Sequence, residues 1–158
     1  MRKPKIYIET TLFNHYFDKD RKTHADTVTL FKQIADGKYE AYTSRYVIEE
    51  LEKALEPKRT QMLALIPQLG IRVLTSDPEA ESLAEIYVAA GILPVKYRTD
   101  GVHIALASIH AFDVIVSANF EHIVNPKTIR MTGVANIKTG CNPVHIASPK
   151  EFLQHENH

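Results

Sequence analysis

The stretch that decides the fold is residues 98–125, R-T-D-G-V-H-I-A-L-A-S-I-H-A-F-D-V-I-V-S-A-N-F-E-H-I-V-N. Its first part carries apolar residues at positions i, i+3, i+4 and i+7, namely Val102, Ala105, Leu106 and Ile109. This spacing predicts an amphipathic helix with one apolar face. Thr99 is the expected N-cap, so Asp100 lies in the first turn, where free amide groups and the helix dipole favour a carboxylate.

The second part of the stretch predicts a buried strand. Residues 114–117 are mostly β-branched and apolar, and they follow the polar Asp113. Such a run is typical of a strand inside a parallel sheet. Asn119 comes directly after it, at the carboxyl end of the strand, where open α/β sheets place their sites.

The remaining sequence continues this alternation of helix and strand. Further strands are predicted at residues 5–9, 39–43, 71–74 and 144–147. A first helix is predicted after its N-cap, Thr10 or Thr11. Two further helices are predicted at residues 25–35, with Val28 facing inward, and at residues 45–55, with Leu55 facing inward. Another helix is predicted to end at residue 65 or 66, and two more span residues 78–90 and 126–138. Residues 149–153 are expected to form a terminal turn. Strands separated by helices predict a mostly parallel five-stranded α/β sheet with helices on both faces.

Composition narrows the classes of protein that this chain can represent. Its 158 residues suit a single domain, expected over residues 1–153, with a disordered tail at 154–158. Nineteen basic and nineteen acidic residues cancel, so no global charge indicates a nucleic-acid or membrane partner. The single cysteine, Cys141, excludes an internal disulfide and a cysteine-rich zinc site. Without a signal peptide or a membrane-length apolar run, a cytoplasmic location is expected.

Three carboxylates stand out by position. Glu9 ends the first strand, Glu50 lies near the buried side of its helix and Asp100 opens another helix. Because parallel strands end at one edge of a sheet, Glu9 and Asn119 are expected to face one cleft with Asp100. Gathered carboxylates repel, and Mg²⁺ or Mn²⁺ with its preference for oxygen ligands relieves that repulsion. Such a metal supports phosphodiester hydrolysis.

Simpler structural roles remain open for the same residues. Each carboxylate taken singly fits a strand-end charge, a solvated helix face or a partner of the helix dipole. His103 follows Asp100 by three residues and could be a zinc ligand, but no second His or Cys has metal spacing, which favours a hydrogen-bonded structural histidine.

The order of motifs resembles that of PIN-domain proteins of the kind found as VapC-type toxins. The matching pieces are Y-I-E-T-T-L-F (7–13), S-R-Y-V-I-E-E-L (44–51), T-D-G-V-H-I-A-L-A (99–107), S-A-N-F-E-H-I-V-N (117–125) and P-V-H-I-A-S-P-K-E-F-L (143–153). The resemblance spans residues 6–153 and implies a three-layer α/β/α sandwich on a five-stranded parallel sheet. It also implies a ribonuclease that uses Mg²⁺ or Mn²⁺.

Carried over by position, the resemblance makes Glu9, Glu50, Asp100 and Asn119 the metal-binding and catalytic residues. Glu9 stands where the family usually has Asp, and Asn119 where many members have a fourth acidic residue. Thr10 and Thr11 match hydroxyl positions after the first acidic residue. The implied partners are an RNA substrate, a small antitoxin and a second copy in a homodimer.

Two other interpretations remain beside the nuclease. A PIN-like domain that has lost cleavage could serve as an RNA- or protein-binding module, and Glu9 and Asn119 keep this alternative open. A receiver-like signalling domain is disfavoured, because T-S-D-P (75–78) after the third strand looks like a helix start. RNA contacts could come from Lys19, Arg21, Lys22, Lys96 and Arg98, and Tyr97 and Phe120 could stack a base.

Overall fold

The computed structural model describes residues 2–156 and contains one five-stranded, all-parallel sheet. Its strands are β1 (Lys5–Ile8), β2 (Glu40–Ser44), β3 (Arg72–Leu74), β4 (Val114–Val116) and β5 (His145–Ala147), in the spatial order β3-β2-β1-β4-β5. The predicted α/β class, strand number and parallel arrangement are confirmed. The central strands pair Ile6 with Ala41 on one side and with Val114 on the other.

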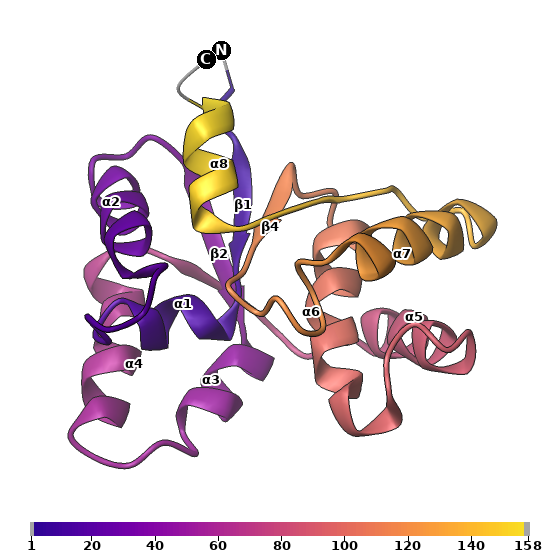
Figure 1. Ribbon diagram of the computed structural model, residues 1–158, viewed down its shortest axis with the longest axis horizontal. Coiled ribbons are helices and arrows are strands. Elements are labelled where there is room, and N and C mark those ends of the chain that lie inside the picture. Colours follow the sequence, from indigo (N-terminus) through magenta and orange to yellow (C-terminus); the bar gives the residue numbers. More distant parts are fainter. Residues whose placement is uncertain (1, 157–158) are drawn as a thin grey trace.

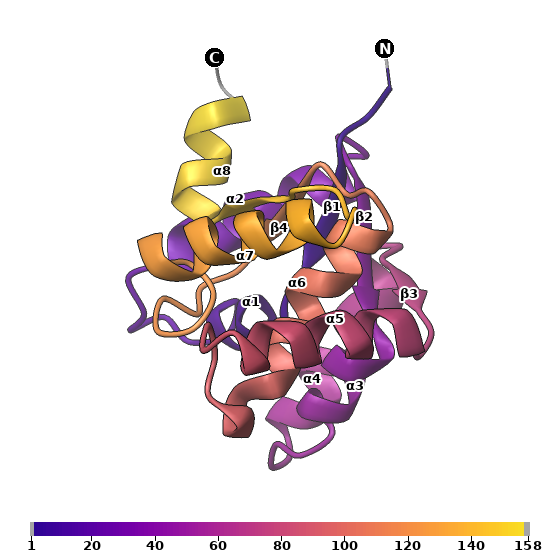
Figure 2. The same cartoon turned by 90° about the vertical axis from the view of Figure 1, so that its right-hand side faces the viewer.

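Helices cover both faces of this sheet. They are α1 (Thr10–His15), α2 (His24–Ala35), α3 (Arg45–Leu51), α4 (Lys58–Gln68), α5 (Pro78–Ala89), α6 (Arg98–Ile109), α7 (Pro126–Lys138) and α8 (Pro149–Glu156). Helices α1, α2 and α4 lie on one side of the strands, and α5, α6 and α7 lie on the other (Figure 1). Figure 2 shows the second layer from outside, with α5 lying across α6.

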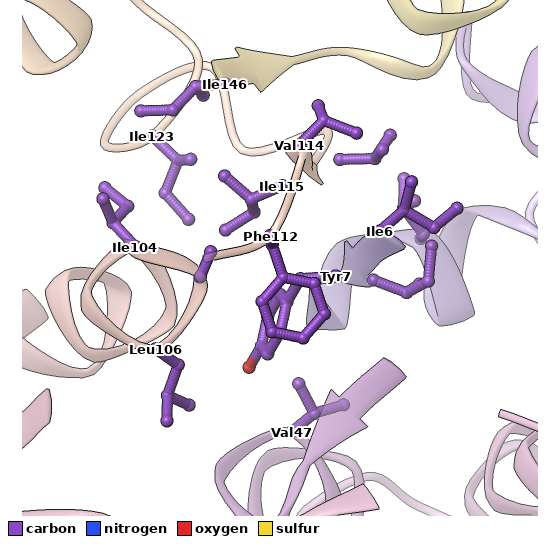
Figure 3. Packing of buried hydrophobic residues seen from close by; sticks show 14 of the residues in the cluster. Ile6, Tyr7, Val47, Ile104, Leu106, Phe112, Val114, Ile115, Ile123 and Ile146 are labelled. Atoms are coloured by element: carbon purple, nitrogen blue, oxygen red, sulfur yellow. The ribbon is translucent and has the colours of Figure 1, made fainter. Parts of the chain in front are cut away.

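One part of the apolar core fills the space between the sheet and α6, and the rest extends among the helices on both sides of the sheet. Ile6, Tyr7, Ile104 and Ile115 are fully buried, and Figure 3 shows how such side chains from the strands and α6 converge. The Tyr7 and Phe112 rings pack edge to face, with centroids 5.9 Å apart and an interplanar angle of 83°. Tyr7 thus joins the apolar core while its hydroxyl group remains available for a polar contact.

Helix α6 differs from the prediction in two ways. A 3₁₀ turn (Val95–Tyr97) precedes it, so Tyr97 takes the N-cap position and Thr99 lies inside the first turn, still beside Asp100. Every residue from 101 to 108 is buried, so the helix is not amphipathic. Its predicted polar side is covered because α5 packs against α6 opposite the sheet, a tertiary contact that local periodicity does not reveal.

Other predicted boundaries and burial assignments were wrong. Helix α3 ends at Leu51, so Leu55 lies beyond it and is 85% exposed. Val28 is an exposed residue of α2. The expected terminal turn is the helix α8, which continues to Glu156, into the stretch predicted as a disordered tail. Residues 157–158 of that tail lie outside the described residues.

Gly101 allows the close packing of α5 on α6. A Cβ atom at this position would meet Leu93 Cδ1 at 3.0 Å, Tyr87 Cδ2 at 3.4 Å and Ala84 Cβ at 3.5 Å. A larger side chain would therefore push the two helices apart or force a rotamer change.

Gly101→Val is expected to lower the free energy of unfolding by about 1–3 kcal/mol, because it overpacks this contact. Gly133→Ala in α7 is the matched control, since a Cβ there meets nothing within 4 Å. That change should raise stability by up to about 1 kcal/mol through helix propensity. Urea denaturation of both variants checks the prediction, and equal effects would contradict the close packing at Gly101.

Candidate active site at the carboxyl edge of the sheet

The ends of β1 and β4 bring the first two candidate residues together. Glu9 follows β1, and its backbone N–H donates to the Val116 carbonyl oxygen at the end of β4, 3.2 Å away. Ser117, Ala118 and Asn119 continue from there. The predicted meeting of Glu9 and Asn119 at one sheet edge is confirmed, because neighbouring parallel strands end side by side.

Glu9 is 2% exposed and held by hydroxyl groups. Its Oε1 accepts hydrogen bonds from the Thr11 Oγ1 at 2.5 Å, the Thr11 N–H at 3.2 Å and the Ser117 Oγ at 2.7 Å. Glu9 itself is therefore the N-cap of α1, so the prediction that Thr10 or Thr11 caps this helix was wrong. Burial raises the pKa of Glu9, although the nearby His103 and these hydroxyl groups oppose the rise.

Glu50 is fixed by two side chains from other elements. Its Oε1 accepts from the Thr10 hydroxyl at 2.6 Å and lies 2.7 Å from His103 Nε2. Burial raises the pKa of Glu50, but the His103 and Thr10 contacts outweigh it, so the pKa lies below its ordinary value. For His103, burial lowers the pKa, whereas Glu50, Glu9 and Asp100 together raise it above the ordinary value.

A series of buried side-chain hydrogen bonds holds the His103 ring on the side opposite Glu50. His103 Nδ1 lies 2.6 Å from the Tyr7 hydroxyl, which lies 2.7 Å from Ser44 Oγ. His103, Ser44 and Tyr7 are all fully buried. The interpretation of His103 as a hydrogen-bonded structural histidine is confirmed. This chain fixes the imidazole ring and, through it, the Glu50 carboxylate.

Asp100 and Asn119 complete the set from α6 and the loop after β4. Burial raises the pKa of Asp100 and the Glu50 charge raises it further, whereas His103, His122 and the Asn119 side chain lower it. The Asn119 Oδ1 accepts from the His122 N–H at 3.0 Å, and the Asn119 N–H donates to Ser117 Oγ at 3.0 Å. Ser117 thus links Glu9 to Asn119.

Sequence reasoning missed the long-range contacts of these supporting residues. The contacts of Tyr7, Ser44 and Ser117 depend on side chains that lie 37 to 108 positions away in the chain. The one available signal was the pair of hydroxyl residues Thr10 and Thr11 after Glu9. They serve two different carboxylates, because successive residues of a helix point in different directions.

The oxygen donors of Glu9, Glu50, Asp100 and Asn119 suit a Mg²⁺ or Mn²⁺ ion that keeps several water ligands better than an ion bound by protein ligands alone. Burial of Glu9 and partial burial of Asp100 raise the pKa of both carboxylates, because ionising them away from water is costly, and a cation would offset that cost. Among residues 2–156, however, no three His, Cys, Asp or Glu side chains are grouped so that they could hold one ion. Mg²⁺ keeps several waters and needs only one or two carboxylates, so these residues fit it.

Some of the cations expected to meet RNA are already paired. Arg98 forms ion pairs with Glu85 and with Glu81, the latter at 3.5 Å. Arg21 pairs with Asp18 at 3.1 Å. Tyr97 stacks on His122, with ring centroids 3.9 Å apart, whereas Phe120 is 51% exposed. Of the two aromatic rings, Phe120 is the one available to a ligand.

Comparison with known proteins places the fold. No protein-family model and no curated protein sequence matches this chain. Among solved structures it resembles Mycobacterium tuberculosis VapC20, a sarcin-ricin loop cleaving toxin, with a TM-score of 0.53 and 14% identity over 70% of this chain and 86% of the other. It also resembles VapBC2 from Rickettsia felis, solved bound to a DNA fragment from its promoter. The TM-score is 0.57 and the identity 10%, over 91% of this chain and 98% of the other.

These similarities show a VapC-like PIN-domain fold, in agreement with the motifs in the sequence. The three-layer α/β/α arrangement is confirmed with it. Within residues 2–156, no helix has both the length and the apolar character that a membrane crossing requires.

Proposed function

We propose that this protein is an endoribonuclease that depends on Mg²⁺ or Mn²⁺ and acts as the toxin of a toxin–antitoxin pair. The observation that carries this proposal is the clustering of the buried Glu9 and the half-buried Asp100 with Glu50 and Asn119 at the carboxyl edge of a VapC-like fold. Carboxylates with raised pKa values, such as Glu9 and Asp100, are found most often at functional sites.

Each residue has a role in this proposal. Of Glu9, Glu50 and Asp100, one or two would bind the metal ion directly and the others through its bound water molecules, and Asn119 would contribute its amide or orient a bound water. A bound divalent metal activates a water molecule and stabilises the negative charge that develops on the phosphodiester. Thr10, Thr11 and Ser117 keep the carboxylates oriented, and His103 fixes Glu50 through a hydrogen bond.

Cleavage of a mixed RNA pool tests the function. The purified protein should cut RNA with Mg²⁺ or Mn²⁺, stop cutting in EDTA and regain activity when metal is returned. Cutting that persists in EDTA would contradict a metal-dependent site. No cutting with either metal by folded protein would contradict the nuclease.

The antitoxin partner rests on the VapBC2 neighbour and is tested separately. A small open reading frame next to the gene should encode a protein that binds this chain and suppresses cleavage. The second expected partner, another copy of this chain, is tested by sedimentation velocity, which should show a homodimer.

An RNA- or protein-binding module without cleavage is the second candidate. The observation that favours it is the lack, among the described residues, of three grouped ligands for one ion. It predicts metal-independent binding of RNA or protein by a chain that cuts no RNA.

Asn119→Asp is expected to tighten Mn²⁺ binding, because it adds a fourth carboxylate beside Asp100. In EDTA the same change should destabilise the fold, since the new charge lies near an existing one. Calorimetric titration and thermal denaturation measure the two effects. An Mn²⁺ affinity that is unchanged or weaker would remove Asn119 from the metal site.

A further inference from the structure

A half-exposed aromatic ring lies next to the candidate site. Phe120 directly follows Asn119 and is 51% exposed, and among the large apolar side chains exposed in residues 2–156 it is the aromatic one. Two hollows border its ring, with volumes of about 320 and 480 Å³. Both are also lined by Lys22 and Thr23, from the segment that leads into α2.

The two hollows connect the candidate site to the start of α8. Ala118 lines the first hollow, and its backbone N–H donates to Thr11 Oγ1, the same hydroxyl that binds Glu9. Ser148 and Lys150 line the second hollow. The first hollow therefore adjoins the residues that hold Glu9, and the second extends from Phe120 to the start of α8.

The two hollows are lined by three basic residues, Arg21, Lys22 and Lys150, and by three acidic residues, Asp20, Asp26 and Glu151. Within residues 2–156, Arg21 is paired with Asp18, whereas Lys22 and Lys150 form no ion pair; the Glu151 carboxylate accepts a hydrogen bond from the Ser148 N–H at 3.0 Å. Asp20 and Asp26 also line the hollows, and carboxylates of this kind accept hydrogen bonds from the amino groups of nucleobases. The two ammonium groups are suited to phosphates.

We propose that Phe120 is the stacking platform for an unpaired base of the RNA strand, with Lys22 and Lys150 contacting the neighbouring phosphates. This inference rests on the proposed function for its substrate. An exposed aromatic ring beside free cations is the usual means of holding a single strand, and each stacked base contributes about 1–3 kcal/mol. Paired bases in a duplex are not free to stack on the ring, so the platform selects single-stranded regions.

The first test compares cleavage by the wild type, Phe120→Ala, Phe120→Tyr and Ile137→Ala. Ile137 is the control because it is 70% exposed on α7. Phe120→Ala should lower kcat/KM for a single-stranded RNA by about 5- to 150-fold, the change that corresponds to one lost stack. Phe120→Tyr and Ile137→Ala should stay close to the wild type. Equal values for Phe120→Ala and Ile137→Ala would overturn the platform.

The second test measures binding without cleavage, so that it does not depend on the nuclease. Fluorescence anisotropy follows a labelled single-stranded RNA and a matched duplex in the Asp100→Asn background with Mg²⁺. Phe120→Ala should weaken binding of the single strand by the same factor and leave the duplex unchanged. Lys22→Ala and Lys150→Ala should each reduce the salt slope of log K by about 0.7, whereas Lys138→Ala should not.

The outcomes separate this inference from the proposed function. A wild type that cuts no RNA, together with Phe120-dependent binding of the single strand, would refute the nuclease and support the platform. RNA cleavage that Phe120→Ala does not affect would support the nuclease and refute the platform. Equal losses for single strand and duplex, or no RNA binding at all, would overturn the platform.

Discussion

Asp100→Asn is expected to lower the rate of metal-dependent RNA cleavage by at least about 100-fold. Loss of a residue that only supports a metal ligand typically costs about 10- to 100-fold, and loss of a ligand itself should cost more. Asparagine keeps the shape of the side chain but removes the charge that would hold the cation. The measurement is the initial rate of cleavage of one defined RNA in Mg²⁺ and in Mn²⁺.

The same variant should not lose stability. Burial raises the pKa of Asp100, so the folded protein binds more protons than the unfolded chain, and this carboxylate destabilises the fold as the pH rises through its pKa. In EDTA at neutral pH, Asp100→Asn should therefore be at least as stable as the wild type. Asp36→Asn, at an exposed position after α2, is the control and should change neither rate nor stability.

His103→Leu is expected to lower the free energy of unfolding by about 1.5–3 kcal/mol, the range for a lost hydrogen bond to a charged group. The change removes the Nε2 contact to Glu50 and the Nδ1 contact to Tyr7 from a fully buried site. It should also slow cleavage, because Glu50 loses the partner that fixes its orientation. His110→Leu is the matched control: its pairing with Asp77 is partly exposed, and its loss should cost under about 1 kcal/mol.

The pH dependence of stability tests the electrostatic pairing of His103 with Glu50, because a loss of packing alone would not vary with pH. The raised pKa of His103 stabilises the fold fully below the ordinary value of 6.5, and the effect is lost as the pH rises through the raised value. The lowered pKa of Glu50 stabilises above 4.5, and this is lost as the pH falls through the lowered value. In EDTA, the stability difference between wild type and His103→Leu should therefore be largest between 4.5 and 6.5. A difference that does not vary with pH would contradict the pair.

The sequence was sufficient for the features that follow from strand order. Apolar runs between helical segments predicted the parallel sheet, and parallel strands necessarily end together, so Glu9 and Asn119 could be assigned to one edge. The absence of a second metal-spaced histidine correctly identified His103 as structural. These conclusions depend on local pattern and on a general property of sheets.

The features that were missed depend on contacts between distant parts of the chain. The burial of α6 on all sides requires α5 to pack on it, and the apolar spacing of α6 describes only the sheet side. Glu9 is the N-cap of α1 because its carboxylate accepts a hydrogen bond from the Thr11 N–H. Glutamate is not among the usual N-cap residues, which include Ser and Thr. The pairing of Glu50 with His103 joins residues 53 positions apart.

The most direct measurement is a Mn²⁺ titration of RNA cleavage by protein stripped with EDTA, for the wild type and Asp100→Asn in parallel. A carboxylate-held metal site predicts that wild-type activity rises and saturates with Mn²⁺, while the variant stays at least about 100-fold lower at every concentration. Cleavage by Asp100→Asn that follows the wild-type curve would show that the metal, if one is needed, binds elsewhere.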